Sequence, residues 1–327
     1  MWDVVFYEVF KEEMAAIKKI LPSRIRAKFF SETIQEAKNP SFAPLISVRT
    51  QSIIPPHFSV DLKGILTRSS GYDHLVAQRN QFEKKISYGY LPHYCSRACA
   101  EQAMLLATAL LRKLPLQVKN FDRFNRDNIT GHECQGKKLL VAGVGRIGSE
   151  VVDIARGLRM DVRGMDLVKR LKDLQYVSLS EGVSWADIEI CSLPLTDRTR
   201  GLLNYKLFRQ AQNQKKSGRG VIFVNISRGE ISPARDLNRL LEEGIFAGVG
   251  LDVFEDEAFL AESLRKGQKF KSSIGQWIQT LRKRDNVILT PHNAFNTYES
   301  TERKAQQSVK AVIEFLEKEK FPDSLSR

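Results

Sequence analysis

The stretch KKLLVAGVGRIGSEVVDIARGLRMDVRGMD, residues 137–166, decides the fold of this chain. Its first part, 137–142, is a short apolar run of the kind that predicts a buried parallel strand. A GxGxxG turn follows, and residues 149–158 carry apolar side chains at helical spacing. A second short strand is expected at 161–165, and it ends at Asp166. The stretch therefore predicts strand, turn, helix, strand and acid in that order.

Each part of this stretch has a physical role in binding a dinucleotide. Gly143 makes the tight turn, Gly145 lets the backbone approach a pyrophosphate, and Gly148 lets the helix pack against the strand. The N-terminus of the helix then faces the phosphates. Asp166 can accept hydrogen bonds from the adenosine ribose, and its charge repels a 2′-phosphate. The stretch therefore predicts a bound dinucleotide, and NAD rather than NADP.

The composition is that of an ordinary soluble globular protein. The chain has 327 residues, enough for two domains with a core each, and it is 42% hydrophobic and 27% charged. A net charge of +13 raises nucleic acid as a partner, but the positive charges are mostly scattered. The densest cluster, 265–284, has seven Lys or Arg residues and no acid. We interpret this segment as a solvated insertion, so nucleic acid is not an expected partner.

The cysteines and the N-terminus indicate the compartment. The four cysteines form no CxxC pair and have no metal-ligand spacing with histidine, so we expect reduced thiols in a cytoplasmic protein and no metal site. The first residues, MWDVVFYEVFKEE, are too acidic and too short in apolar run for a signal peptide. We also expect no membrane span, since no stretch approaches the roughly 20 apolar residues that one requires.

The rest of the chain alternates between predicted strands and helices, which favours an α/β fold with a doubly wound parallel sheet. In the first part, strands are expected at 2–7, 47–54 and 62–68, and helices at 11–20 and 96–114. Beyond Asp166, strands are expected at 188–193, 221–226, 247–253 and 287–290, and helices at 232–244 and 297–318. We place a dinucleotide-binding domain at 96–294. Residues 1–95, completed by 295–327, form the expected substrate domain.

Three side chains at or just beyond predicted strand ends could perform chemistry: Arg228, Glu257 and His292. Strand carboxyl ends converge in such a sheet, so residues distant in sequence can meet there. Arginine grips a carboxylate, and histidine can give or take an alcohol proton. A carboxylate bonded to the imidazole fixes its tautomer. With a hydride carrier, this set suits interconversion of 2-keto and 2-hydroxy acids, although a structural histidine and a solvated loop carboxylate stay open as alternatives.

Five sequence motifs are notable in the second part of the chain: VAGVGRIG, SLPLTDRTRGLLN, VNISRGEISPARDLNRLLEEG, FAGVGLDVFEDE and TPHNAFNT. In this order they resemble the D-isomer-specific 2-hydroxyacid dehydrogenase family, and within it the D-lactate dehydrogenase branch. The resemblance implies a Rossmann domain for NAD and a smaller flavodoxin-like α/β substrate domain. It also implies a homodimer that transfers hydride between NADH and a small 2-keto acid such as pyruvate.

The resemblance also implies roles for individual residues. Arg228 would bind the substrate carboxylate, and Glu257 would pair with His292, the catalytic acid and base. Further substrate contacts are implied for Ser70, Gly71 and Tyr94. Cofactor contacts are implied for Gly143, Gly145, Arg146, Ile147, Gly148, Asp166, Leu193, Pro194, Thr199, Ile226, Ser227 and Asp252.

Departures from the family pattern leave the substrate open. Asn296 stands where lactate-type members have tyrosine, and Gln102 stands where a histidine is usual. Asn296 and Glu299 also fit a helix capping box, which is a purely structural explanation. The alternative substrates are hydroxypyruvate and phenylpyruvate. The alternative from another class is a non-catalytic, NAD(H)-sensing protein similar to a transcriptional corepressor, and the presence of Arg228, Glu257 and His292 favours the enzyme.

Overall fold

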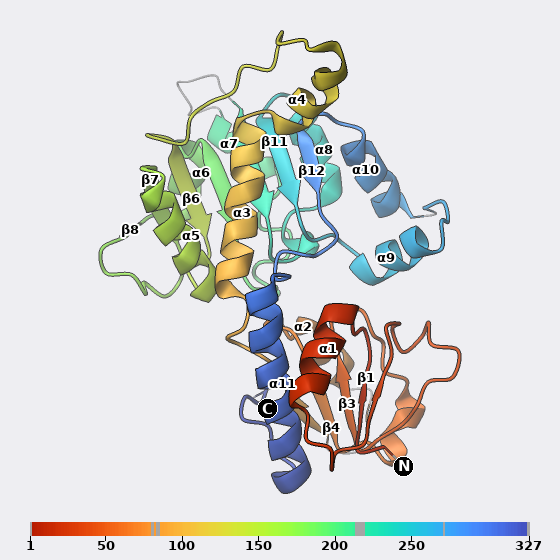
Figure 1. Cartoon of the computed structure of the whole chain (residues 1–327). Helices are drawn as coiled ribbons and strands as arrows, with labels where there is room; N and C mark the ends of the chain where they lie inside the picture. Colours follow the sequence, from red (N-terminus) through yellow and green to blue (C-terminus); the bar gives the residue numbers. More distant parts are fainter. Residues whose placement is uncertain (1, 80–81, 83–85, 213–219, 271, 326–327) are drawn as a thin grey trace. The chain divides into compact units, whose positions relative to one another are not determined.

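The computed structural model describes residues 2–79, 82, 86–212, 220–270 and 272–325. The chain divides into two compact units (Figure 1). Unit 1 consists of residues 1–95 and 296–327, and unit 2 consists of residues 96–295. Among the described residues, no helix combines the length and the apolar character that crossing a membrane requires.

Unit 2 is built on a parallel sheet, which has seven strands in the part of the chain that the structure describes. The strands lie in the order β12-β11-β10-β9-β6-β7-β8. From β6 the chain first adds β7 and β8 on one side and then β9 to β12 on the other, so the order reverses between β6 and β9. The bounds are β6 Lys138–Ala142, β7 Asp161–Met165, β8 Gln175–Tyr176, β9 Ile188–Cys191, β10 Val221–Asn225, β11 Phe246–Leu251 and β12 Val287–Leu289. The predicted doubly wound α/β fold is confirmed.

Helices cover both faces of this sheet. On one face lie α3 and α5, and on the other α6, α7 and α8 (Figure 1). The strands are therefore buried on both sides, and every residue of β10 is buried. The helices are α3 Ser96–Leu111, α4 Leu114–Asn120, α5 Arg146–Gly157, α6 Leu179–Trp185, α7 Tyr205–Gln212, α8 Ala234–Glu242, α9 Glu257–Arg265 and α10 Ser273–Arg282, with short 3-10 turns η3 Phe121–Arg123 and η4 Gly229–Ile231.

Two expectations for unit 2 were wrong. The helix expected at 96–114 ends at Leu111, because Lys113 takes a left-handed conformation (φ 52°) before α4 begins. The basic segment 265–284 is more than a solvated insertion. It contains α10, whose apolar face places Ile278 and Leu281 in the core while Arg282 and Lys283 are exposed.

Unit 1 contains a second parallel sheet, with strand order β2-β1-β3-β4-β5 over the residues that can be described. This order is that of flavodoxin-like folds, as expected. Its strands are β1 Val4–Phe6, β2 Ala27–Phe29, β3 Leu45–Val48, β4 Gly64–Thr67 and β5 Ser87–Gly89, and its helices are α1 Lys11–Ile20, α2 Asp73–Gln78 and α11 Tyr298–Lys318, with the 3-10 turn η1 Pro56–Val60. The helices α1 and α11 pack together (Figure 1).

The strand expected at 47–54 ends early, at Val48. The carboxylate of Glu8 accepts hydrogen bonds from the backbone of Arg49, Gln51 and Ser52, which turns the chain away from the sheet. The backbone nitrogens after Val48 thus bond to a side chain and not to a neighbouring strand, which the apolar pattern could not indicate.

Candidate active site

The glycine turn between β6 and α5 has the geometry that dinucleotide binding requires. Gly143 has a φ of +94°, which glycine adopts without strain. A Cβ on Gly148 would lie 2.0 Å from the carbonyl oxygen of Gly143, so this position needs glycine for helix and strand to approach. A Cβ on Gly145 would meet open space. That space, at the N-terminus of α5, is where a pyrophosphate fits.

Asp166 completes this site from the end of β7. Its Oδ2 accepts a hydrogen bond of 2.7 Å from the backbone nitrogen of Val144, inside the glycine turn. Its Oδ1 accepts one of 3.0 Å from the nitrogen of Val168. Two backbone bonds fix the carboxylate beside the turn, and each oxygen keeps a lone pair for a ribose hydroxyl. The residues present therefore fit NAD.

The loop after β9 lies against the glycine turn at the reversal of strand order. Ser192 donates a hydrogen bond of 2.6 Å from Oγ to the oxygen of Gly143. Leu193, a predicted cofactor residue, is buried. The hydroxyl of Thr199 donates to the oxygen of Pro194 at 2.6 Å and so closes this loop. The predicted residues Leu193, Pro194 and Thr199 thus belong to one ordered loop at the place where such sheets bind ligands.

A buried asparagine shapes the loop that carries Arg228. The side chain of Asn225 is completely buried, and its Nδ2 donates to the oxygen of Arg228 and to Oγ of Ser232, both at 2.8 Å. Its Oδ1 accepts from the nitrogen of Ser227 at 3.0 Å. The guanidinium of Arg228 donates from Nη1 to the oxygen of Ser227 at 2.7 Å. The sequence analysis missed Asn225, although it lies in the motif VNISRGEISPARDLNRLLEEG, three residues before Arg228.

Glu257 and His292 meet in the structure. Nδ1 of His292 and Oε1 of Glu257 lie 2.6 Å apart, and the two side chains are 20% and 18% exposed. Glu257 begins α9 and His292 follows β12. Because Nδ1 is used in this contact, Nε2 is the ring nitrogen left for a substrate. His292 and Asp256 have φ values of 49° and 48°, a left-handed strain that is common where a site fixes its side chains.

Asp252 holds the loop that carries His292. Its side chain is completely buried, and its Oδ1 accepts hydrogen bonds from Oγ1 of Thr290 at 2.5 Å and from the nitrogen of Asn293 at 2.9 Å. Its Oδ2 accepts from the nitrogen of Ala294 at 2.8 Å. Burial raises the pKa of Asp252, while the neighbouring His292 and these hydrogen bonds act in the opposite direction. The structure thus gives Asp252 a positioning role, and its contact with the cofactor stays a prediction.

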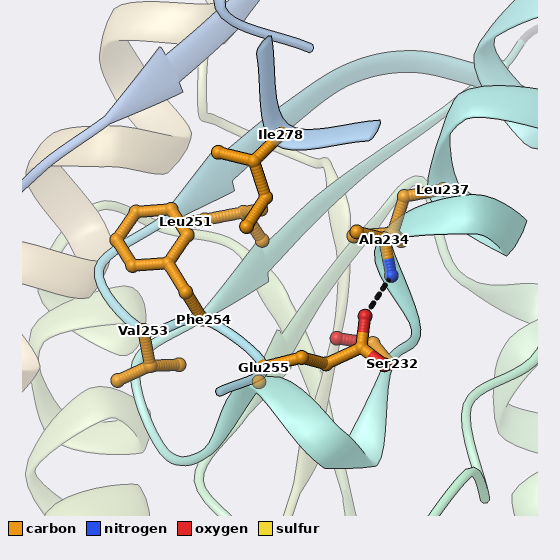
Figure 2. A pocket seen from close by; sticks show the side chains of 9 residues that line it. Ser232, Ala234, Leu237, Leu251, Val253, Phe254, Glu255 and Ile278 are labelled. Atoms are coloured by element: carbon orange, nitrogen blue, oxygen red, sulfur yellow. Dashed lines mark hydrogen bonds between the residues drawn. The ribbon is translucent and has the colours of Figure 1, made fainter. Parts of the chain in front are cut away.

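The loops after β10 and β11 pack closely against each other, and Figure 2 shows the residues between them. A Cβ on Gly229 would lie 2.0 Å from the carbonyl carbon of Phe254. Oε2 of Glu255 accepts a hydrogen bond of 2.6 Å from the nitrogen of Ala234, at the start of α8. The cavity between them has a volume of only about 10 Å³, room for one water at most. It is a packing gap rather than a substrate site.

The substrate residues predicted in unit 1 lie close to one another. Oγ of Ser69 donates to the oxygen of Gly71 at 2.6 Å and fixes the turn around Ser70. The thiol of Cys95 lies 3.8 Å from Oγ of Ser70, which places the turn beside the segment of Tyr94. The side chain of Tyr94 is only 3% exposed.

The capping box proposed for Asn296 is wrong by one position. Thr297 caps α11, and its hydroxyl accepts a hydrogen bond of 3.1 Å from the nitrogen of Ser300. Asn296 lies outside the cap, and its Oδ1 is 3.5 Å from the hydroxyl of Thr301. A capping role therefore does not explain Asn296.

Comparisons with known proteins agree with this geometry. The model of the D-isomer specific 2-hydroxyacid dehydrogenase, NAD binding domain, matches residues 103–294. A glyoxylate reductase of Korarchaeum cryptofilum is 25% identical over 98% of this chain and 89% of its own. A D-lactate dehydrogenase of Lactiplantibacillus plantarum is 28% identical over 78% and 76%. The crystal structure of the Aquifex aeolicus D-lactate dehydrogenase with NAD and lactic acid superposes with a TM-score of 0.82, at 28% identity, over 99% of this chain and 100% of that one.

Proposed function

The chain belongs to the D-isomer-specific 2-hydroxyacid dehydrogenase family, and from this premise we propose that Arg228, Glu257 and His292 reduce a small 2-keto acid to its D-2-hydroxy acid. Membership makes the protein an NAD-dependent oxidoreductase. The observation that carries the proposal is the 2.6 Å contact between His292 and Glu257. Arg228, Glu257 and His292 follow β10, β11 and β12, which are neighbours in the sheet.

In this reaction NADH supplies the hydride to C2 of the substrate. Arg228 binds the substrate carboxylate and fixes the plane of the keto acid. Protonated His292 donates a hydrogen bond from Nε2 to the keto oxygen and then delivers its proton to the alkoxide that forms. Glu257 holds the imidazole at Nδ1 and stabilises its positive charge. In unit 1, Ser70, Gly71 and Tyr94 are the further substrate contacts.

We propose pyruvate as the first substrate to test, because several similar proteins are D-lactate dehydrogenases. Asn296 replaces the usual tyrosine of that branch, so the side-chain preference needs a direct measurement. Other relatives are named glyoxylate reductase and aromatic 2-oxoacid reductase, so both small and aromatic keto acids belong in the panel.

The test is NADH oxidation by the purified protein with pyruvate, hydroxypyruvate, glyoxylate, 2-ketobutyrate and phenylpyruvate. Turnover on at least one acid, lost in His292→Ala, is the expected result. NADPH serves as the parallel cofactor and should be used poorly because of Asp166. Tight NADH binding without turnover on any acid would contradict the proposed reaction and favour an NAD(H)-sensing protein.

The assembly that we propose is a homodimer through unit 2. Large apolar side chains on α3, α4 and η3 and just beyond are exposed, among them Phe121 at 72% and Phe124 at 73%, together with Leu105, Leu114 and Val118. A monomer rarely exposes so many apolar side chains in adjacent elements, which supports a partner surface there. Light scattering should give twice the mass of one chain, and Val118→Asp should lower the measured mass towards that of a monomer.

The cytoplasm is the proposed location, and the state of the cysteines supports it. Cys95, Cys99, Cys134 and Cys191 are all free thiols. Burial raises the pKa of the Cys191 thiol to about 11, so it remains protonated. Free thiols are typical of reducing compartments.

A further inference from the structure

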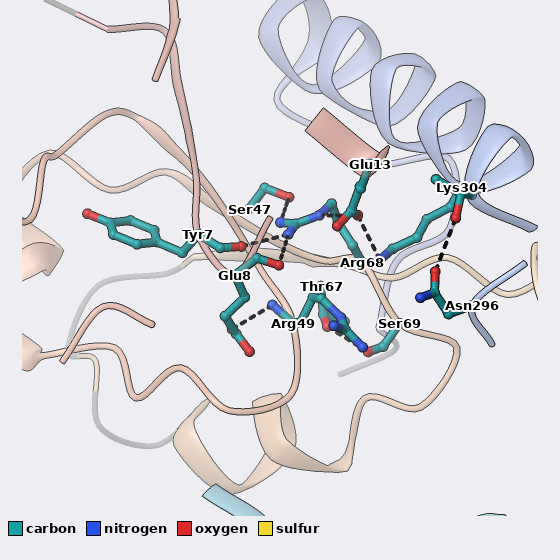
Figure 3. Close-up of polar contacts among 11 residues, drawn as sticks. Tyr7, Glu8, Glu13, Ser47, Arg49, Thr67, Arg68, Ser69, Asn296 and Lys304 are labelled. Atoms are coloured by element: carbon teal, nitrogen blue, oxygen red, sulfur yellow. Dashed lines mark hydrogen bonds and ion pairs between the residues drawn. The ribbon is translucent and has the colours of Figure 1, made fainter. Parts of the chain in front are cut away.

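Among the described residues of unit 1, three charged side chains are completely buried (Figure 3). Glu13 comes from α1, Arg68 follows β4, and Lys304 lies on α11. Oε1 of Glu13 is 2.7 Å from Nζ of Lys304 and 2.9 Å from Nε of Arg68. One carboxylate oxygen therefore joins two cations from elements far apart in the sequence.

Arg68 connects this cluster to the predicted substrate loop. Its Nη1 donates to Oγ of Ser47 at 3.0 Å, and its Nη2 donates to the oxygen of Tyr7 at 2.6 Å. These bonds fix the guanidinium at the carboxyl ends of β1, β3 and β4. Ser69, Ser70 and Gly71 follow Arg68 directly in the chain, so the position of that loop depends on how Arg68 is held.

The same turn of α11 also holds Tyr94. Nε of Arg303 donates to the backbone oxygen of Tyr94 at 2.9 Å. Nζ of Lys304 lies 5.7 Å from the centroid of the Tyr94 ring, within the range of a cation–π interaction. Two adjacent residues of one helix thus contact Tyr94 directly, and Lys304 is connected to the Ser69–Gly71 loop through Glu13 and Arg68.

The charge of Lys304 does not stabilise the folded protein. Burial lowers the pKa of Lys304 to about 7, and the charges of Arg49 and Arg68 act in the same direction, against that of Glu13. A buried ammonium with a lowered pKa makes the folded state less stable at neutral pH. Without it, Glu13 and Arg68 would remain as a balanced pair. Stability alone therefore does not account for a lysine at this position.

We propose that Lys304 is a positioning residue for substrate binding, holding the Ser69–Gly71 loop, through Glu13 and Arg68, against Tyr94. The proposal rests on the proposed reduction of a 2-keto acid. Lys304 itself touches no reacting atom. Its effect should consequently appear in the affinity for the keto acid and not in the affinity for NADH.

Lys304→Met is the first variant, because methionine fills the same volume without a charge. We expect the KM for the accepted keto acid to rise roughly tenfold, the size of a coupling between neighbouring buried residues. The kcat at saturation and the Kd for NADH should stay unchanged. Lys304→Arg keeps the charge and should restore most of the affinity. Lys310→Met, an exposed position on the same helix, is the matched control and should leave KM unchanged.

The dependence of KM on pH provides the readout that a structural role would not give. Lys304 faces Glu13 on α1 and Arg68 after β4, with the charge of Arg49 nearby after β3. Because its pKa is about 7, it loses its charge above neutral pH, and the wild-type KM should rise there. In Lys304→Arg the charge persists, so the KM of this variant should rise less. The rest of the chain is identical in the two proteins, so the difference between their KM profiles reports the side chain at position 304.

The outcomes separate this inference from the proposed function. If the wild type reduces no keto acid, the proposed function is wrong. If the wild type is active and folded Lys304→Met keeps its KM at every pH, the positioning role is wrong. Should Lys304→Met fail to fold, Lys304→Arg decides, since a KM with the same pH dependence as the wild type would overturn the inference.

Discussion

Nδ1 of His292 lies 2.6 Å from Oε1 of Glu257, although 35 positions separate them in the sequence. The contact is formed from two loops that are themselves fixed. Asp252 binds the backbone on the C-terminal side of His292, and the loop before Glu257 packs on Gly229 and α8. The imidazole is therefore oriented before any substrate arrives, which is the property that a proton donor in a hydride transfer needs.

His292→Ala should reduce turnover by roughly 10²- to 10⁴-fold, the usual contribution of a positioned acid or base. NADH binding should survive, because the glycine turn and Asp166 lie at other strands. Steady-state kinetics give the first quantity, and titration of NADH fluorescence gives the second. A variant that turns over normally would exclude His292 as the proton donor.

Glu257→Gln removes the charge beside the imidazole and keeps the size of the side chain. We expect kcat to fall by roughly 10²-fold or more, as in other sites where an acid that orients a histidine becomes an amide. The double variant Glu257→Gln with His292→Ala should be no slower than His292→Ala alone, because the two residues act as a unit. Additive losses in the double variant would show that Glu257 acts separately.

Arg228→Ala should weaken binding of the keto acid by about 3 kcal/mol, roughly 10²-fold in KM, because the substrate carboxylate loses its charged partner, a hydrogen-bonding guanidinium. Arg228→Lys should recover little of this loss, since an ammonium cannot form the paired hydrogen bonds of a guanidinium. KM is measured against the keto acid at saturating NADH. Unchanged KM in both variants would remove Arg228 from the site.

Two glycine substitutions test the cofactor site against each other. Gly145→Ala adds a methyl group that meets no protein atom within 4 Å, so Tm should stay unchanged while the Kd for NADH rises. Gly148→Ala places its methyl group 2.0 Å from the oxygen of Gly143, so Tm should fall even without NADH. The measurements are thermal unfolding and NADH titration. Normal NADH binding by Gly145→Ala would contradict a pyrophosphate at that turn.

The buried cluster of unit 1 makes stability depend on pH in two windows. Burial opposes ionisation of Glu13, but the charges of Arg68, Lys304 and Arg49 lower its pKa from 4.5 to about 2. Folded protein then binds fewer protons, so stability should be lost as pH falls through this interval. The lowered pKa of Lys304 should make stability rise from about pH 7 towards 10.5. Denaturant unfolding across pH should show the alkaline rise in the wild type and not in Lys304→Met.

The sequence was most informative where local pattern and structure coincide. Residues 137–166 predicted β6, α5 and β7 almost to their ends, because apolar runs and glycine turns act within a few residues. The edge strands β2 and β5 were missed, since each has three residues and little apolar pattern. The helices α9 and α10 were missed as well, because their apolar positions lie among many charged ones.

The candidate site was predictable in its members and not in its contacts. Spacing placed Arg228, Glu257 and His292 at strand ends, and the resemblance to a family paired Glu257 with His292. A local sequence pattern cannot show how close two loops lie in the folded protein. Asn225 was missed because a polar residue at the end of an apolar strand gives no signal of being buried. Lys304 was missed for a similar reason, since a lysine on an amphipathic helix is expected to face water.

Unit 2 is continuous in the chain, whereas unit 1 is interrupted by it. The helix that completes unit 1, α11, brings Phe315 against Gly64 on β4 and Lys304 against Glu13 on α1. During synthesis, residues 1–95 leave the ribosome before unit 2. The face of their sheet that α11 covers stays open until all of unit 2 has been made. A nascent chain can therefore fold its cofactor-binding unit while the substrate-binding unit is still incomplete. At this stage the apolar face of the unfinished sheet is exposed, and the protein most needs protection from aggregation.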